Sequence, residues 1–177
     1  MSLRLYAYAM MMSIFSLSAP AAAQNSIADT HTQSAHVHGV AHLSVAVDAQ
    51  IIVMDLEMPL ENLVGFEHKP ETELEKEAFE HASQTLAQAG DLFQLSNGAG
   101  CTLTSKTIEM PTFEHGSHQD VDARFQYHCT SIAELRSLKV TLFDAFEHIE
   151  TLKTIYIDDE RQLAKTLTHD QPVFAIR

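Results

Sequence analysis

Between Ala41 and Met58, apolar residues alternate with polar ones, and this pattern constrains the fold more than any other stretch. An apolar residue at every second position is typical of strands that bury one face. A tight turn at Ala49 and Gln50 would make a hairpin in which apolar side chains oppose each other at every step. The pairs in that register are Val47 with Ile52, Val45 with Met54, and Leu43 with Leu56, and His42 then lies opposite Glu57.

A second hairpin is predicted, with strands over residues 101–109 and 121–129. If its loop is centred on His115, Cys101 lies opposite Cys129 at a Cα separation of about 4.5–5.5 Å, which suits a disulfide. These are the only two cysteines in the chain. A lone pair of cysteines in an exported protein indicates a disulfide. We therefore predict a Cys101–Cys129 bond at the base of this hairpin.

One longer helix is predicted over about residues 72–89, after a loop over residues 59–70. Thr72 and Glu75 have the spacing of a capping box, which marks a helix start. Apolar residues at helical spacing would then face the core. They are Leu74, Ala78, Ala82 and Leu86.

Further strands are predicted over residues 138–143, 152–158, 162–168 and 173–176, with a turn or short helix at 143–146. These strands do not alternate with helices. The expected fold is therefore α+β, with a mainly antiparallel sheet, one longer helix and a disulfide-bridged hairpin.

The first 23 residues have the features of a cleavable signal peptide. Arg4 precedes an apolar run, and Ala21, Ala22 and Ala23 provide small residues for cleavage before Gln24. The apolar run is shorter than the roughly 18–20 residues of a membrane span, so no membrane insertion is expected after cleavage. Residues 24–35 are polar and indicate a flexible lead-in. Residues 36–177 then suit a single domain.

The chain is acidic, with a formal net charge of −13 that becomes more negative when Arg4 is removed with the leader. This charge argues against binding to nucleic acids or to anionic membrane surfaces.

Three histidines, His36, His38 and His42, fall within seven positions. Neutral imidazole is the commonest protein ligand of borderline divalent metals. If the first strand extends back to them, His36 and His38 share a face, roughly 6.5 Å apart, and can bind one metal ion. His42 would lie about 13 Å from His38. A simpler role for His42 is an ion pair with Glu57.

Two loops carry further candidate ligands. In the hairpin register above, the chain that leaves Met58 passes near His38, so Glu67 and His68 could complete the site. The alternative is that His68 is simply an exposed histidine in a loop. His115 and His118 lie in the loop of the second hairpin, which is either a metal-capture site or simply a polar loop. The sequence has no His-Glu-x-x-His, no Gly-x-Ser-x-Gly and no phosphate-binding glycine loop. It is therefore not predicted to be an enzyme.

Several motifs occur in an order that resembles the zinc-regulated periplasmic proteins of the ZrgA type. They are HVHGVA at 36–41, NLVGFEHKP at 62–70, Gly100 and Cys101 with Cys129, and LFDAF at 142–146. The resemblance implies a role in zinc acquisition across the Gram-negative envelope. Members of this family often carry a longer stretch rich in His and Asp at the position of residues 114–120, which is short here.

The sequence thus predicts a periplasmic zinc-binding accessory protein that sequesters Zn²⁺ and supports its uptake, with a zinc-uptake transporter or its binding protein as partner. The candidate ligands are His36, His38, Glu67, His68, His115 and His118. Copper or nickel binding is an alternative, because histidine and carboxylate ligands accept these metals too. Alternatives from other classes are a metal-dependent hydrolase and a structural or adhesion module.

Overall fold

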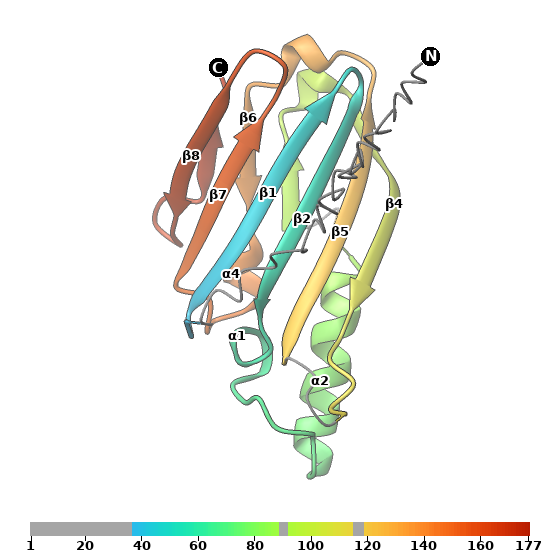
Figure 1. Cartoon of the computed structure of the whole chain (residues 1–177), viewed down its shortest axis with the longest axis vertical. Coiled ribbons are helices and arrows are strands. Elements are labelled where there is room, and N and C mark those ends of the chain that lie inside the picture. The colour runs from blue at the N-terminus through green and yellow to red at the C-terminus, as the bar shows by residue number, and fades with distance from the viewer. Residues whose placement is uncertain (1–36, 89–91, 115–118) are drawn as a thin grey trace, which may run out of the picture. The chain divides into compact units, whose positions relative to one another are not determined.

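The computed structural model describes residues 37–88, 92–114 and 119–177, which form two sheets and a few helices. The larger sheet has the strand order β4-β5-β2-β1-β7-β8 (Figure 1). Its strands are β1 (Val40–Asp48), β2 (Ile51–Pro59), β4 (Cys101–Glu109), β5 (Asp120–Cys129), β7 (Thr151–Ile157) and β8 (Gln162–Leu167). The smaller sheet has the order β3-β6-β9, from β3 (Phe93–Leu95), β6 (Ser137–Val140) and β9 (Val173–Ala175). The helices are α1 (Glu61–Val64), α2 (Glu73–Leu86) and α4 (Leu142–Ala145), with 3₁₀ turns η1 (Asn97–Ala99) and η2 (Ile132–Glu134).

The first hairpin has the predicted register. Val47 pairs with Ile52, Val45 with Met54, Leu43 with Leu56, and His42 with Glu57. The turn at Ala49 and Gln50 is confirmed too, and Ala49 takes a positive φ of 50° there. Leu43, Val45, Ile52, Met54 and Leu56 are almost fully buried, as the alternation requires, and Val47 near the turn is half-buried.

The second hairpin carries the predicted disulfide. Cys101 and Cys129 are register partners and are bonded, with a Cα separation of 3.9 Å. A β-bulge between Leu103 and Ser105 shifts the register of the rest of this hairpin. The hydroxyl of Thr104, the extra residue, donates a hydrogen bond to the carbonyl of Gln126.

The fold is predominantly sheet with one longer helix, as expected, but one strand pair is parallel. β1 and β7 run side by side, with Val40 opposite Thr151 and Ala46 opposite Ile157. All other pairs of strands within the two sheets are antiparallel over the described residues.

The core lies between one face of the larger sheet and the elements that cover it. In Figure 1, α2 and β6 lie behind the six strands. Phe125 on β5 is fully buried and contacts Phe93 on β3, with ring centroids 5.4 Å apart, so the two sheets share this core. Leu86 near the end of α2 is fully buried in the same cluster.

Helix α2 begins where the sequence predicts. The Thr72 hydroxyl accepts a hydrogen bond from the Glu75 backbone, and the Glu75 carboxylate accepts one from the Thr72 backbone. The predicted core stripe is only partly correct. Ala82 and Leu86 are buried, whereas Leu74 is 79% exposed. In Figure 1 the start of α2 extends beyond the end of the sheet, which agrees with the exposure of Leu74.

The other element boundaries differ from the predictions in a few places. The helix ends at Leu86 rather than near residue 89, and residue 89 lies outside the described residues. The loop after β2 contains the short helix α1. The strand predicted over 138–143 ends at Val140, because residues 142–145 form α4 instead. β3 was not expected from the sequence.

No helix within the described parts of the chain is long and apolar enough to cross a membrane. The predicted signal peptide (1–23) and lead-in (24–35) lie outside the described residues, as do His36, His115 and His118. The division into leader, lead-in and one domain over 36–177 therefore stays a prediction.

Candidate metal site

The segment that carries His38 is held against α1 by a buried asparagine. Asn62, fully buried, accepts a hydrogen bond from the Gly39 backbone N–H at 2.8 Å and donates one to the Val40 carbonyl at 2.9 Å. These two bonds satisfy backbone groups at the start of β1, before its pairing with β2 begins at His42. They place His38 beside the loop that follows β2.

The sequence-based idea that His38 lies on a strand is wrong. β1 begins at Val40, and Val40 closes a turn by donating to the Val37 carbonyl. Gly39 has a φ of +79°, which removes His38 from the alternation of the strand. The pairing of His36 with His38 on one strand face therefore loses its geometric basis, and His36 itself lies outside the described residues.

Both ring nitrogens of His38 face carboxylates. Its Nδ1 lies 3.1 Å from Oε2 of Glu61, and its Nε2 lies 3.2 Å from Oε1 of Glu67. Zinc bonds of about 2.0–2.1 Å at a tetrahedral angle put ligand atoms about 3.3 Å apart, so either pair has nearly the spacing of two zinc ligands. The two nitrogens point to opposite sides of the ring. One ion can therefore use one nitrogen and one of these carboxylates, but not both pairs.

His68 turns away from His38 toward helix α2. Its Nδ1 lies 3.0 Å from the Lys69 carbonyl, which can only accept, so Nδ1 carries the proton of that bond. The opposite nitrogen, Nε2, lies 3.7 Å from Oε1 of Glu75. An imidazole that donates one N–H to a backbone carbonyl has the orientation often seen in metal-binding histidines. The Phe66 ring stacks on that of His68, with centroids 5.0 Å apart.

Glu75 is fixed by the start of α2. Its Oε2 accepts hydrogen bonds from the backbone N–H groups of Glu71 and Thr72, which leaves Oε1 toward His68. The backbone N–H groups of Thr72 and Glu71 hold the pKa of Glu75 below its usual value, and the nearby His68 adds to this effect. The carboxylate thus stays ionised beside the imidazole over a wide pH range.

The structure brings together some of the predicted ligands. His38 contacts Glu67, as the predicted path of the chain after Met58 implied, whereas His68 pairs with Glu75 instead. Among the described residues, no three or more His, Cys, Asp or Glu side chains are grouped so that they could hold one ion. Glu61 and Glu75 were not among the candidate ligands predicted from the sequence. The hairpin register could have indicated Glu61, because it follows the end of β2, next to the start of β1.

His42 lies in a different place, in a row of charged side chains across the exposed face of the larger sheet. Glu57, Asp122 and Glu109 follow His42 in register on β2, β5 and β4. Desolvation raises the pKa of Asp122, and repulsion from Glu57 and other neighbouring carboxylates raises it further. The pairing of His42 with Glu57 confirms the predicted register.

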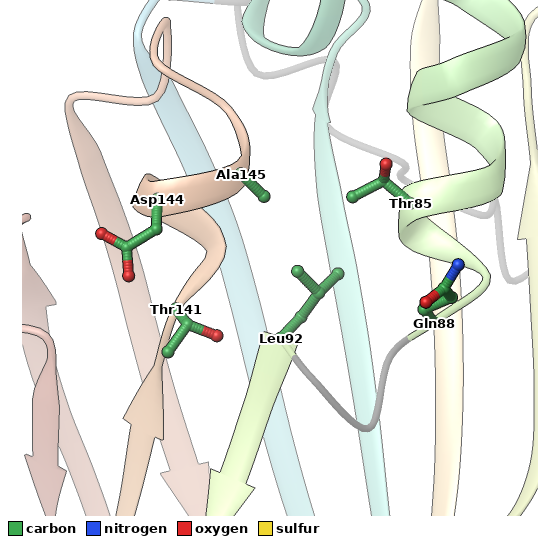
Figure 2. A pocket seen from close by; sticks show the side chains of 6 residues that line it. All are labelled: Thr85, Gln88, Leu92, Thr141, Asp144 and Ala145. Carbon is green, nitrogen blue, oxygen red and sulfur yellow. The ribbon is translucent and has the colours of Figure 1, made fainter.

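A cavity of about 290 Å³ lies between the end of α2 and α4. Figure 2 shows Thr85 and Gln88 on one side and Thr141 and Asp144 on the other, with Leu92 between them. Asp144 is the only carboxylate in its described lining, which includes no imidazole. The side chains that suit zinc are therefore found around His38 and His68 rather than here.

Comparison with known families gives one match. The sequence model of the family described as ZrgA family zinc uptake protein matches residues 35–176. That range contains every candidate ligand named above. No curated protein matches the chain.

Proposed function

The chain belongs to the ZrgA family of zinc uptake proteins, and from this premise we propose that it is a periplasmic accessory protein that binds Zn²⁺ and passes it to an uptake system. The predicted signal peptide supports export. In this proposal zinc is the cargo, and the protein has no catalytic role.

The observation that carries the proposal is the carboxylate at each ring nitrogen of His38, at 3.1 Å and 3.2 Å. Zinc is a borderline ion that accepts imidazole nitrogen and carboxylate oxygen, and both ligand types are present at zinc-like spacing. The His38 side chain is 58% exposed, so an ion can reach it from solvent. A site with few protein ligands and open access suits a carrier, because a carrier must release its ion as well as capture it.

The remaining candidate ligands would add capacity around this site. His68 presents Nε2 next to Glu75, and His36 precedes His38 by two residues. The histidines of the second hairpin loop, His115 and His118, would form a separate and weaker capture site.

Zinc titration of the exported chain, followed by competition with a chromophoric chelator, tests the proposal. His38→Ala should weaken the tightest site at least tenfold, because it removes the imidazole whose ring nitrogens face Glu61 and Glu67. His128→Ala is the matched control, because His128 is also an exposed histidine. It lies next to Cys129 at one end of β5, whereas Asp120 is at the other end. Equal zinc binding by both variants and the unchanged chain would refute the role of His38. No zinc binding by the unchanged chain would refute the function.

The loop site is tested with the double variant His115→Ala/His118→Ala. It should retain the tight site and lose a weaker one. Loss of all zinc by this variant would show that the two histidines belong to the primary site.

Transfer is tested by mixing the zinc-loaded protein with the zinc-binding component of an uptake transporter and measuring where the zinc goes. Directional transfer that is faster than spontaneous release would support a carrier. Transfer at the rate of spontaneous release would indicate a store without a docking partner. Titration with Cu²⁺ and Ni²⁺ in parallel identifies the preferred metal.

A further inference from the structure

A third segment, between α4 and β7, packs against both loops of the candidate metal site. The backbone N–H groups of Glu150 and Thr151 donate to the Gly39 carbonyl at 2.8 Å and 2.9 Å. A Cβ on Gly39 would lie 3.0 Å from the Glu150 side chain, so this side chain lies directly against the backbone next to His38. The 146–150 segment is thus part of the surroundings of His38.

The same segment places an imidazole against the other loop. A Cβ on Gly65 would lie 3.0 Å from Nε2 of His148. Gly65 has a φ of +80° and ends α1, and the absence of a side chain there leaves room for the ring. His148 is an exposed residue whose ring makes no hydrogen bond or ion pair with any residue that the structure describes. Nε2 faces Gly65 in the structure, and a turn of this exposed ring about its side-chain torsions would present Nε2 to a ligand.

Gly65 lies close in the chain to the two glutamates, Glu61 and Glu67, whose carboxylates contact His38. Its N–H donates to the Glu61 carbonyl at 2.8 Å, and Glu67 follows it by two residues, a path of at most about 7 Å. Because the His148 ring lies against Gly65, the His148 side chain is placed beside the short segment that leads to Glu67. His148 is about 80 residues from Glu67 in the chain, so sequence spacing alone does not place the two residues together.

We propose that His148 supplies a second imidazole, through Nε2, to the zinc ion that His38 and Glu67 bind. This inference rests on the proposed function. Three protein ligands would leave a fourth tetrahedral position for water or for a ligand of the receiving protein. In the structure these three side chains do not yet converge on one point, so the exposed His148 ring must turn about its side-chain torsions to join the ion.

Zinc competition titration of His148→Ala tests the ligand. The expected result is at least a tenfold weaker tight site with unchanged stoichiometry, while His128→Ala binds as the unchanged chain does. Replacement of an exposed side chain should leave the fold intact, and circular dichroism of the variant checks this. A second readout is the imidazole nitrogen spectrum of ¹⁵N-histidine-labelled protein, in which added Zn²⁺ should shift Nε2 of His148 together with a ring nitrogen of His38.

The outcomes separate this inference from the function on which it rests. If His148→Ala binds zinc like the unchanged chain while His38→Ala does not, the inference is wrong and the zinc-binding function stands. If His148→Ala weakens binding but the His148 ring shows no zinc-induced shift, the residue is not a ligand and the inference is also wrong. If the unchanged chain binds no zinc, the proposed function itself is wrong.

Discussion

Replacement of Asn62 by alanine should destabilise the protein and loosen the segment that carries His38. Asn62 is fully buried and makes two hydrogen bonds to backbone groups that precede the pairing of β1 with β2, the Gly39 N–H and the Val40 carbonyl. Alanine can make neither bond. It also leaves the volume of a carboxamide group unfilled beneath the start of β1.

The magnitude follows from the two groups left behind. A buried donor or acceptor without a partner costs about 1–3 kcal/mol. The Gly39 N–H should incur most of this penalty, whereas the Val40 carbonyl belongs to a half-buried residue and can recover part of it from water. The expected loss in the free energy of unfolding is therefore about 3 kcal/mol. For a chain of this length that corresponds to a fall in Tm of roughly 6–12 °C.

Urea unfolding of the disulfide-intact protein, followed by circular dichroism, measures this loss. Asn97→Ala is the matched control, because Asn97 is an exposed asparagine in η1 and its loss should change stability by less than about 0.5 kcal/mol. Asn62→Asp adds a second comparison: a carboxylate can still accept from Gly39 but cannot donate to Val40. A loss below about 1 kcal/mol for Asn62→Ala would refute the argument that these two bonds hold the His38 segment.

Three further predictions concern the disulfide, the charged row and the adjacent histidines. The variant Cys101→Ala/Cys129→Ala should lose about 3.6 kcal/mol of unfolding free energy on the loop-entropy model for the 28-residue separation, and an unchanged urea midpoint would contradict this. Asp122→Asn should raise the free energy of unfolding by about 0.5 kcal/mol at pH 7, because the raised pKa of Asp122 means that its ionised form destabilises the fold. This gain should vanish near pH 3, where the carboxyl is protonated in both the folded and the unfolded state. A loss of stability at pH 7 would refute the prediction. If His36 and His38 bind one ion, each alanine variant should weaken zinc binding and the double variant should add little, whereas additive effects in calorimetry would assign them to separate ions.

The sequence predicted the local hairpins well, because each depends on neighbouring segments. The alternation from Ala41 to Met58 excludes a one-residue slip, which would turn the apolar residues to the other face, and the short turn then fixes the register. The disulfide followed from the same reasoning. The parallel pairing of β1 with β7 was not predictable in this way, because alternation shows that a strand has a buried face but not which distant strand lies beside it.

The candidate site was predictable only where it depends on that same register. The approach of Glu67 to His38 follows from the path of the chain after Met58. The turn at Gly39 removed His38 from the strand, and a positive φ at a glycine leaves no trace in the periodic pattern. His148 lies near Gly65 only because the strand that follows it joins β1, which is the long-range pairing that the pattern could not reveal.

The bulge in β4 also bears on how the protein avoids self-association. β4 is at the edge of the larger sheet, where unpaired backbone groups can recruit a strand from another molecule. The bulge between Leu103 and Ser105 interrupts the regular spacing of those groups, and the Lys106 ammonium next to it donates to the Ala87 carbonyl at the end of α2. A second copy of the chain would have to match an irregular edge and displace a charged side chain. Edge-to-edge aggregation at β4 is thereby disfavoured.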